Sequence, residues 1–253
     1  MIYNYGTLGF YTAKANRQYD NTDNDTIIHH FVTDSIPDVQ IIVDSAVASA
    51  TYKLYDEDDT EIASGTCTVN STTNDAGTAY SQITIEDETT SGQADGKYYL
   101  KVTYGTTDLY SDMFCWRTTV SGYLKIEAQT SALKIGAFPT ADFTYTVYFD
   151  SQKYQEEYEI QEEGEEKTYG IVPSFVSRNR VHTHEIAGYD KTYNFLSGLR
   201  AVEVNGTIKV TWNSEENEVY DVSVEKKSSF ANDLYVIELK FKLKDYLQTH
   251  NIV

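Results

Sequence analysis

Tyr98-Tyr99-Leu100-Lys101-Val102-Thr103-Tyr104 is the stretch that decides the fold. Successive side chains of a β-strand point to opposite faces of the sheet. The alternation puts Tyr98, Leu100 and Val102 on one face and the residues between them on the other, which predicts a strand with one buried and one solvated face. The chain holds 22 tyrosines and only three prolines, and tyrosine suits both faces because its ring is apolar and its hydroxyl can stay hydrated. The sequence therefore predicts a β-rich protein.

Length and composition predict two β-rich domains behind a polar arm. The 253 residues exceed the usual ~150 residues of one domain. We expect an N-terminal arm over residues 1–25, because this stretch is polar and ends in Asp20-Asn21-Thr22-Asp23-Asn24-Asp25. An immunoglobulin-like β-sandwich should follow over residues 26–118. Residues 119–253 should form a second β-sandwich-type domain with one short helix.

Seven strand candidates separated by turn signals fit an antiparallel sandwich in the first domain. Asp95-Gly96-Lys97-Tyr98 is similar to the turn and tyrosine that open strand F of immunoglobulin-like domains. The antibody Cys…Trp…Cys spacing is absent, since Trp116 directly follows Cys115, so only the architecture is predicted. The candidates are Thr26–Val32, Val39–Val47, Thr51–Tyr55, Glu61–Val69, Tyr80–Ile85, Lys97–Tyr104 and Leu109–Arg117.

Strand-like runs continue in the second domain around one predicted helix. Asp190–Gly198 has an Asp at the position of an N-cap and a glycine at its end, which predicts a short helix. Asn205-Gly206 predicts a hairpin turn between two strands. The strand candidates are Tyr123–Glu127, Phe143–Phe149, Tyr154–Ile160, Val181–Ile186, Ala201–Val204, Thr207–Trp212, Val219–Val224 and Leu234–Leu243.

The charge of the chain and its N-terminus exclude several classes of function. A net charge of −19 disfavours sequence-independent binding to nucleic acid, because that affinity comes from Lys and Arg replacing counterions on phosphates. The first residues lack the cationic and apolar segments of a signal peptide, and no run approaches the ~20 apolar residues of a membrane span. We therefore expect a chain made in the cytosol, without a membrane partner. Cys67 and Cys115 could form an inter-sheet disulfide, but this location favours two reduced thiols.

His182-Thr183-His184-Glu185 is the strongest metal candidate, since residues two apart on a strand point the same way. No third ligand stands at a recognised spacing, so a polar strand face is the favoured interpretation. The acidic runs Asp20–Asp25 and Asp56–Asp59 lack the glycine and glutamate of an EF-hand loop. Phosphate-binding glycine loops, a nucleophile elbow and a Cys/His dyad are also absent. We expect no catalytic residue, no metal and no cofactor.

The segment Glu156–Glu166 holds seven acids and no base, and bases follow later in the chain. Within one domain this pattern is a solvated hairpin tip and a charged strand face. Between copies of the chain, an acidic projection and a basic face would set the register of a head-to-tail contact. The candidate residues of a subunit interface are Glu156, Glu157, Glu162, Glu163, Glu165, Glu166, Arg178, Arg180, Lys226 and Lys227.

Several elements resemble virion proteins of crAss-like short-tailed phages of Bacteroides, in particular ring or collar components of the tail. The resemblance spans roughly Thr51 to Lys244 as a pattern of elements, and it contains no catalytic motif. The elements that carry it are Tyr110–Cys115, Tyr123–Ile126, the Glu162–Glu165 hairpin before Pro173, the Asp190–Leu199 helix, Tyr220–Val222 and Leu234–Phe241.

The resemblance implies a non-enzymatic virion protein assembled in the host cytoplasm. It implies a homo-oligomeric ring with the twelvefold symmetry of the portal, in contact with other portal and tail proteins. DNA would pass through the channel without sequence-specific contacts, and an acidic lumen agrees because it repels phosphate. The alternative is an immunoglobulin-like cell-surface or secreted module that binds glycans or proteins. A metal-dependent enzyme centred on His182 and His184 is a third interpretation.

Overall fold

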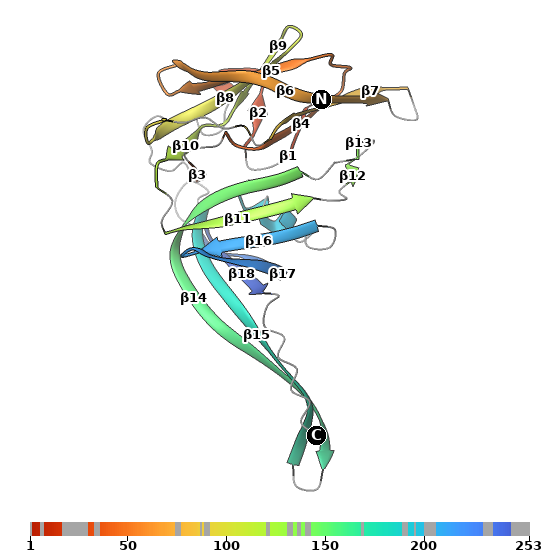
Figure 1. Ribbon diagram of the computed structural model, residues 1–253, viewed down its shortest axis with the longest axis vertical. Helices are drawn as coiled ribbons and strands as arrows, with labels where there is room; N and C mark the ends of the chain where they lie inside the picture. The colour runs from red at the N-terminus through yellow and green to blue at the C-terminus, as the bar shows by residue number, and fades with distance from the viewer. Residues whose placement is uncertain are drawn as a thin grey trace. The chain divides into compact units, whose positions relative to one another are not determined.

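The computed structural model describes most of the chain as β-strands with one short α-helix (Figure 1). The prediction of a mainly β protein with one short helix is confirmed. The strands divide into two compact units, residues 1–150 and 151–253. The described residues are 2–5, 8–16, 30–32, 36–73, 77–86, 88, 92–119, 122–130, 134–135, 138–139, 143–167, 170–188, 192–194, 196–199, 206–229 and 235–243.

The first unit contains a strongly curled sheet. β6 pairs with β5 through its first half and with β7 through its second half, so one strand belongs to two groups of strands. β7 continues to β4 and β1, while β5 continues to β8, β9 and β10. The strands are β1 (Ile2–Tyr5), β2 (Phe10–Tyr11), β3 (His30–Val32), β4 (Val39–Val43), β5 (Ala50–Asp56), β6 (Glu61–Thr73), β7 (Ala79–Ile85), β8 (Gly96–Tyr104), β9 (Thr107–Ser111), β10 (Phe114–Arg117), β11 (Tyr123–Thr130), β12 (Lys134–Ile135) and β13 (Phe138–Pro139).

The predicted alternation of buried and solvent-facing side chains along β8 is correct except at one residue of the outer face. Leu100 and Val102 are fully buried, as the pattern predicts. Tyr99 was expected to face solvent but is also buried. Its ring stacks on Tyr55 with centroids 5.2 Å apart, and its hydroxyl donates to Asp59 at 2.8 Å. A second, smaller cluster therefore covers the outer face of β8, which a strand-by-strand pattern does not reveal.

Tyr98 closes the turn that leads into β8. Its hydroxyl donates a hydrogen bond of 3.0 Å to the carbonyl oxygen of Ala94. Its ring packs against Trp116, with centroids 5.9 Å apart in an edge arrangement. The turn is thereby fixed both by a hydrogen bond and by burial in the core.

The described N-terminal residues, 2–5 and 8–16, pair with strands of the first unit, whereas the sequence predicted a separate arm over residues 1–25. β1 pairs with β4, and β2 pairs with β9. Leu8 and Phe10 are each 4% exposed. The buried carboxylate of Asp112 accepts the Gly9 N–H at 2.8 Å, and the Asp112 N–H donates to the Gly9 oxygen at 2.9 Å. A few apolar residues within a polar stretch are sufficient to dock it.

Five further strands, together with β11, make up the rest of the described sheet. β14 pairs with β11 up to Asp150 and with β15 from Ser151 onward, so it forms hydrogen bonds with a different strand in each half. The strand order β14-β11-β16-β17-β18-β15 closes because β14 meets β15, giving a six-strand barrel in place of the sandwich predicted for residues 119–253. The bounds are β14 (Phe143–Lys167), β15 (Gly170–Gly188), β16 (Gly206–Trp212), β17 (Glu215–Ser229) and β18 (Tyr235–Leu243).

The sequence predicted the position of the helix but not where it ends. Residues 192–194 and 196–199 are helical, with Leu196 and Leu199 buried, so the helix passes through Gly198 instead of stopping there. The expected Asp190 cap, the strand Ala201–Val204 and the residue Asn205 of the expected turn lie outside the described residues. A two-residue hairpin turn joins β16 to β17 at Asn213 and Ser214, both with positive φ.

β14 and β15 continue past the barrel as a two-stranded ribbon, here called the ribbon, made of residues 157–167 and 170–180 (Figure 1). The last described pair between β15 and β18 joins Val181 to Lys242. Beyond it, within the described part of the chain, the two strands pair only with each other. At roughly 3.3 Å per residue, the ribbon is on the order of 35 Å long.

Candidate functional site at the root of the ribbon

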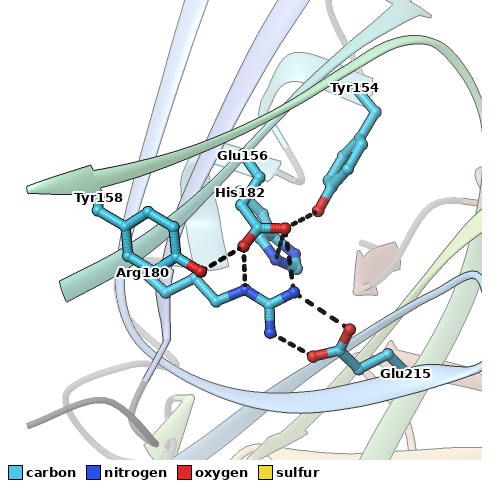
Figure 2. A network of polar contacts seen from close by, with 6 residues as sticks. All are labelled: Tyr154, Glu156, Tyr158, Arg180, His182 and Glu215. Atoms are coloured by element: carbon cyan, nitrogen blue, oxygen red, sulfur yellow. Dashed lines mark hydrogen bonds and ion pairs between the residues drawn. The ribbon is translucent and has the colours of Figure 1, made fainter.

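Six side chains meet where the ribbon leaves the barrel, and we call them the ribbon root (Figure 2). The strand register places Glu156 opposite His182 and Tyr158 opposite Arg180. Because side chains two apart on a strand share a face, these residues gather on one side of the sheet. The ribbon root consists of Tyr154, Glu156 and Tyr158 on β14, Arg180 and His182 on β15, and Glu215 on β17.

Arg180 ties three strands together. Its Nε and Nη2 donate to the two carboxylate oxygens of Glu156 at 2.8 and 3.1 Å. Its Nη2 also donates to Glu215 Oε2 at 3.1 Å, and its Nη1 donates to the other oxygen of Glu215. The Arg180 side chain is only 10% exposed. Paired hydrogen bonds between a guanidinium and a carboxylate are strong and directional, so Arg180 clamps β14 to β17 from β15.

The carboxylate of Glu156 uses all of its acceptor positions. Two bonds come from Arg180, and the hydroxyls of Tyr154 and Tyr158 donate the others at 3.1 and 2.9 Å. An ionised carboxylate has about four acceptor sites, and these donors fill them. The hydrogen bonds from Arg180 are the main reason that the pKa of Glu156 falls from its usual 4.5 to about 2. Glu156 therefore stays ionised over the whole neutral range.

His182 and His184 lie beside this network and are almost completely buried, at 2% and 0% exposure. Ser151 Oγ donates its hydrogen to the Lys153 carbonyl oxygen, so in its 3.0 Å contact with His184 it accepts a hydrogen bond from Nδ1–H. His184 Nε2 thus carries a lone pair, and neither it nor the two ring nitrogens of His182 have a hydrogen-bond partner in the described part of the chain. Burial lowers the pKa of His184 to about 3 and also lowers the pKa of His182.

The geometry does not complete a metal centre around these histidines. Their ring centroids are 6.3 Å apart, and His182 Nε2 lies 4.0 Å from Glu156 Oε2. Glu156 has no acceptor position left for a metal. Over the residues that the structure describes, no group of three or more His, Cys, Asp or Glu side chains is placed to hold a metal ion.

Arg180 corrects the interface predicted from the sequence. It was expected as an exposed base that meets the acids of another copy, but it is buried and bound to acids of its own chain. Lys226 lies over the rings of Tyr193 and Tyr235, at 4.5 and 4.1 Å from their centroids. Lys227 pairs with Glu225 and Glu238. Glu157 is exposed and bonded to Gln155. The side chains of Glu162, Glu163, Glu165, Glu166 and Arg178 lie outside the described residues, although their backbones form the ribbon.

Sequence reasoning missed Tyr154, Tyr158 and Glu215. A signal for the first two is present in Tyr154-Gln155-Glu156-Glu157-Tyr158, where alternate residues are polar groups that can bond to one another. Glu215 has no such local signal, because it reaches Arg180 only through the β16–β17 hairpin.

Among the described residues, no helix has the length and apolar character needed to cross a membrane. Comparison with known proteins assigns the chain to no family: no protein-family model matches it, and neither does any curated protein.

Proposed function

We propose that the protein is a non-enzymatic structural subunit of a phage virion, one copy of a homo-oligomeric ring in the portal-proximal tail or collar around the DNA channel. The ribbon is the observation that carries the proposal. A lone two-stranded hairpin is only marginally stable in water, and its edges offer unpaired backbone groups to another chain. A neighbouring subunit would supply the partner that the ribbon lacks among the described strands.

The charge of the ribbon favours a head-to-tail contact. The segment Glu156–Glu166 carries seven acids, so two ribbons laid side by side would repel each other. A ribbon seated on a different surface of the next copy makes a heterologous contact, which generates a ring if the rotation closes. Since Glu156 is bound to Arg180, we assign the contact with a neighbouring subunit to the four acids farther along the ribbon, Glu162, Glu163, Glu165 and Glu166. Their role is to set register more than affinity.

The proposal includes an immunoglobulin-like sandwich in the first unit. The strand pairings are compatible with two sheets that share β6. This strand pairs with β5 on one side and with β7 on the other, β5 pairs in turn with β8, and β7 pairs with β4. The bond from the Tyr98 hydroxyl to the Ala94 oxygen has the form of a tyrosine corner, in which a tyrosine near the start of strand F bonds a few residues upstream. Both features support the architecture that the sequence suggested.

The alternative, a module that grips glycans with exposed aromatic rings, has less support. Of the large hydrophobic side chains described, only Tyr158 counts as exposed, and its hydroxyl is held by Glu156. A single ring offers little platform for a sugar. Portal, tail and neighbouring subunits remain the proposed partners, and the virion remains the proposed location.

The test reverses the charge at the outer part of the ribbon. Glu162, Glu163, Glu165 and Glu166 are changed together to Lys, and the masses of parent and variant are compared by analytical ultracentrifugation at low salt. We expect the parent to form a closed oligomer of defined mass and the variant to remain a folded monomer. A matched control changes four exposed acids elsewhere to Lys and should assemble normally: Asp44, Glu57, Asp58 and Asp150. A parent that stays monomeric at all concentrations and is missing from purified particles would end the ring proposal.

A further inference from the structure

Buried polar atoms without partners are concentrated beside the ribbon root. His182 Nδ1 and Nε2 and His184 Nε2 lack hydrogen-bond partners, and the indole N–H of Trp212 nearby also lacks one, within the described residues. The four rings of Tyr154, His182, His184 and Trp212 pack together, with the closest centroids 5.0 Å apart. Most buried polar groups in native proteins are paired. Such a cluster therefore calls for a physical explanation.

Two explanations fit poorly with the geometry. A metal ion would find only the two imidazoles, because the acceptor positions of Glu156 are filled by Arg180 and two tyrosines. A small-molecule ligand would need an open interior, yet even barrels of about eight strands are just wide enough to be filled by their own side chains. A six-strand barrel is narrower. An unpaired imidazole nitrogen is a base, and it readily binds a proton.

We propose that the ribbon root is an acid-operated joint, in which a proton taken up by His182 displaces Arg180 from Glu156 and frees the ribbon. The proton binds an unpaired ring nitrogen of His182 and creates a buried imidazolium. Glu156 is the acceptor within reach, 4.0 Å from Nε2. Its Oε2 already accepts from Arg180 Nη2 and from the Tyr154 hydroxyl, so the imidazolium must replace one of these donors. Arg180 is the one displaced, because the two cations repel each other whereas the tyrosine is neutral. The inference rests on these contacts and does not depend on the ring proposal.

The charges around His182 explain why the joint stays closed at neutral pH. On its own strand, Arg180 disfavours a second cation, while Glu156 on β14 and Glu215 on β17 favour it. Tyr154 on β14 packs against the His182 ring and is neutral, and the second titratable ring nearby is His184 on β15, with centroids 6.3 Å apart. Phe241 on β18, which lies opposite His182 in the strand register, and Trp212 on β16 are uncharged and contact the His184 ring. Burial is the largest effect, and it favours the neutral imidazole.

The direction of the pH effect follows from this balance. A histidine whose pKa is lower in the folded than in the unfolded chain contributes stability that is complete above its ordinary pKa of 6.5 and is lost as the pH falls toward the folded value. The joint should therefore begin to lose stability as the pH falls below about 6.5. If one proton opens the joint, hydrogen-exchange protection of the ribbon root falls by about tenfold per pH unit.

The experiment follows the ribbon root from about pH 8 to about pH 4. Protection of the β14 and β15 backbone amides is measured by hydrogen exchange and corrected for the intrinsic pH dependence of exchange. In a Trp116→Phe background the only remaining tryptophan is Trp212, whose fluorescence reports on the neighbouring imidazoles because imidazolium quenches indole. We expect protection and fluorescence to fall together in the parent.

The variant His182→Gln keeps a neutral polar side chain that does not titrate, and it should retain ribbon protection throughout this range. His250→Gln removes an imidazole elsewhere in the sequence and should behave as the parent. Identical protection curves for the parent and His182→Gln would overturn the inference. If His182→Gln does not fold, ¹⁵N spectra of histidine in the parent decide: opening of the ribbon while His182 remains neutral would overturn it, and opening together with protonation would support it.

Discussion

Replacing Arg180 with Met should destabilise the second unit by about 2–3 kcal/mol. Methionine has similar length and no charge, so the substitution removes the guanidinium and retains much of the packing. The lost contacts are the bonds to Glu156 and Glu215. Two carboxylates then face each other without the cation that separated them.

The magnitude follows from two independent estimates. Removing one partner of a fully buried ion pair costs about 3–5 kcal/mol, and the partners here are only partly buried, with Glu156 29% and Glu215 50% exposed. The pKa of Glu156 falls from 4.5 to about 2, and at about 1.36 kcal/mol per pKa unit this corresponds to at most about 3–4 kcal/mol. Solvent screening reduces both values, which leads to the expected range.

The assay is urea unfolding followed by Trp212 fluorescence in the Trp116→Phe background. A double-mutant cycle with Glu156→Gln and Glu215→Gln separates the two carboxylates. We expect the coupling of Arg180 to Glu156 to exceed its coupling to Glu215, because Glu156 is better shielded from water. As a control, Lys227→Met removes ion pairs made by a lysine whose side chain is 39% exposed and should leave the urea midpoint nearly unchanged. A cost for Arg180→Met below about 1 kcal/mol, or a larger coupling to Glu215, would refute the clamp.

Three further outcomes follow from the structure. Gly65→Ala should destabilise the first unit by about 1–3 kcal/mol, because the new Cβ would lie 2.5 Å from the hydroxyl oxygen of the buried Tyr52. Urea unfolding followed by Trp116 fluorescence measures this change, and an unchanged midpoint would contradict the prediction. Tyr98→Phe should cost about 1 kcal/mol through loss of the bond to Ala94, measured by the same unfolding curve, and a stabilising effect would argue against it. Glu156 has a lowered pKa, so its contribution to the free energy of unfolding is complete above pH 4.5 and is lost as the pH falls toward about 2. Glu156→Gln should remove this dependence of stability on acid. A variant as acid-sensitive as the parent would show that other groups cause the dependence.

The parts of the fold that follow from local sequence were predictable. Alternation along β8, the helical segment around Leu196 and the shared face of His182 and His184 each depend on residues a few positions apart. The change of partners along β6 was not predictable in this way, since it depends on which strands lie beside it. For the same reason two separate strand candidates, Phe143–Phe149 and Tyr154–Ile160, proved to be one strand.

The clamp shows the same limit in the candidate site. Arg180 bonds to residues 24 and 35 positions away, so only the register of three strands brings the groups together. An arginine among alternating polar residues resembles a surface residue, because arginine is seldom buried unless it is paired. The prediction of Arg180 as a base offered to another copy failed because its partners were already present within the chain.

The clamp and the proposed docking role of the ribbon are linked through entropy. A hairpin that moves freely at its root must be ordered when it binds, and ordering reduces affinity. Arg180 fixes that root before any partner arrives, with bonds that a neighbour does not have to supply. Loss of the clamp should therefore weaken docking even when the acids that meet the neighbour are untouched. Salt would act differently, because it would screen the proposed contact of Glu162, Glu163, Glu165 and Glu166 with a neighbour far more than a network built around a side chain that is 10% exposed. Acid and salt should thus weaken assembly through separate parts of the same ribbon, the first at its root and the second along its length.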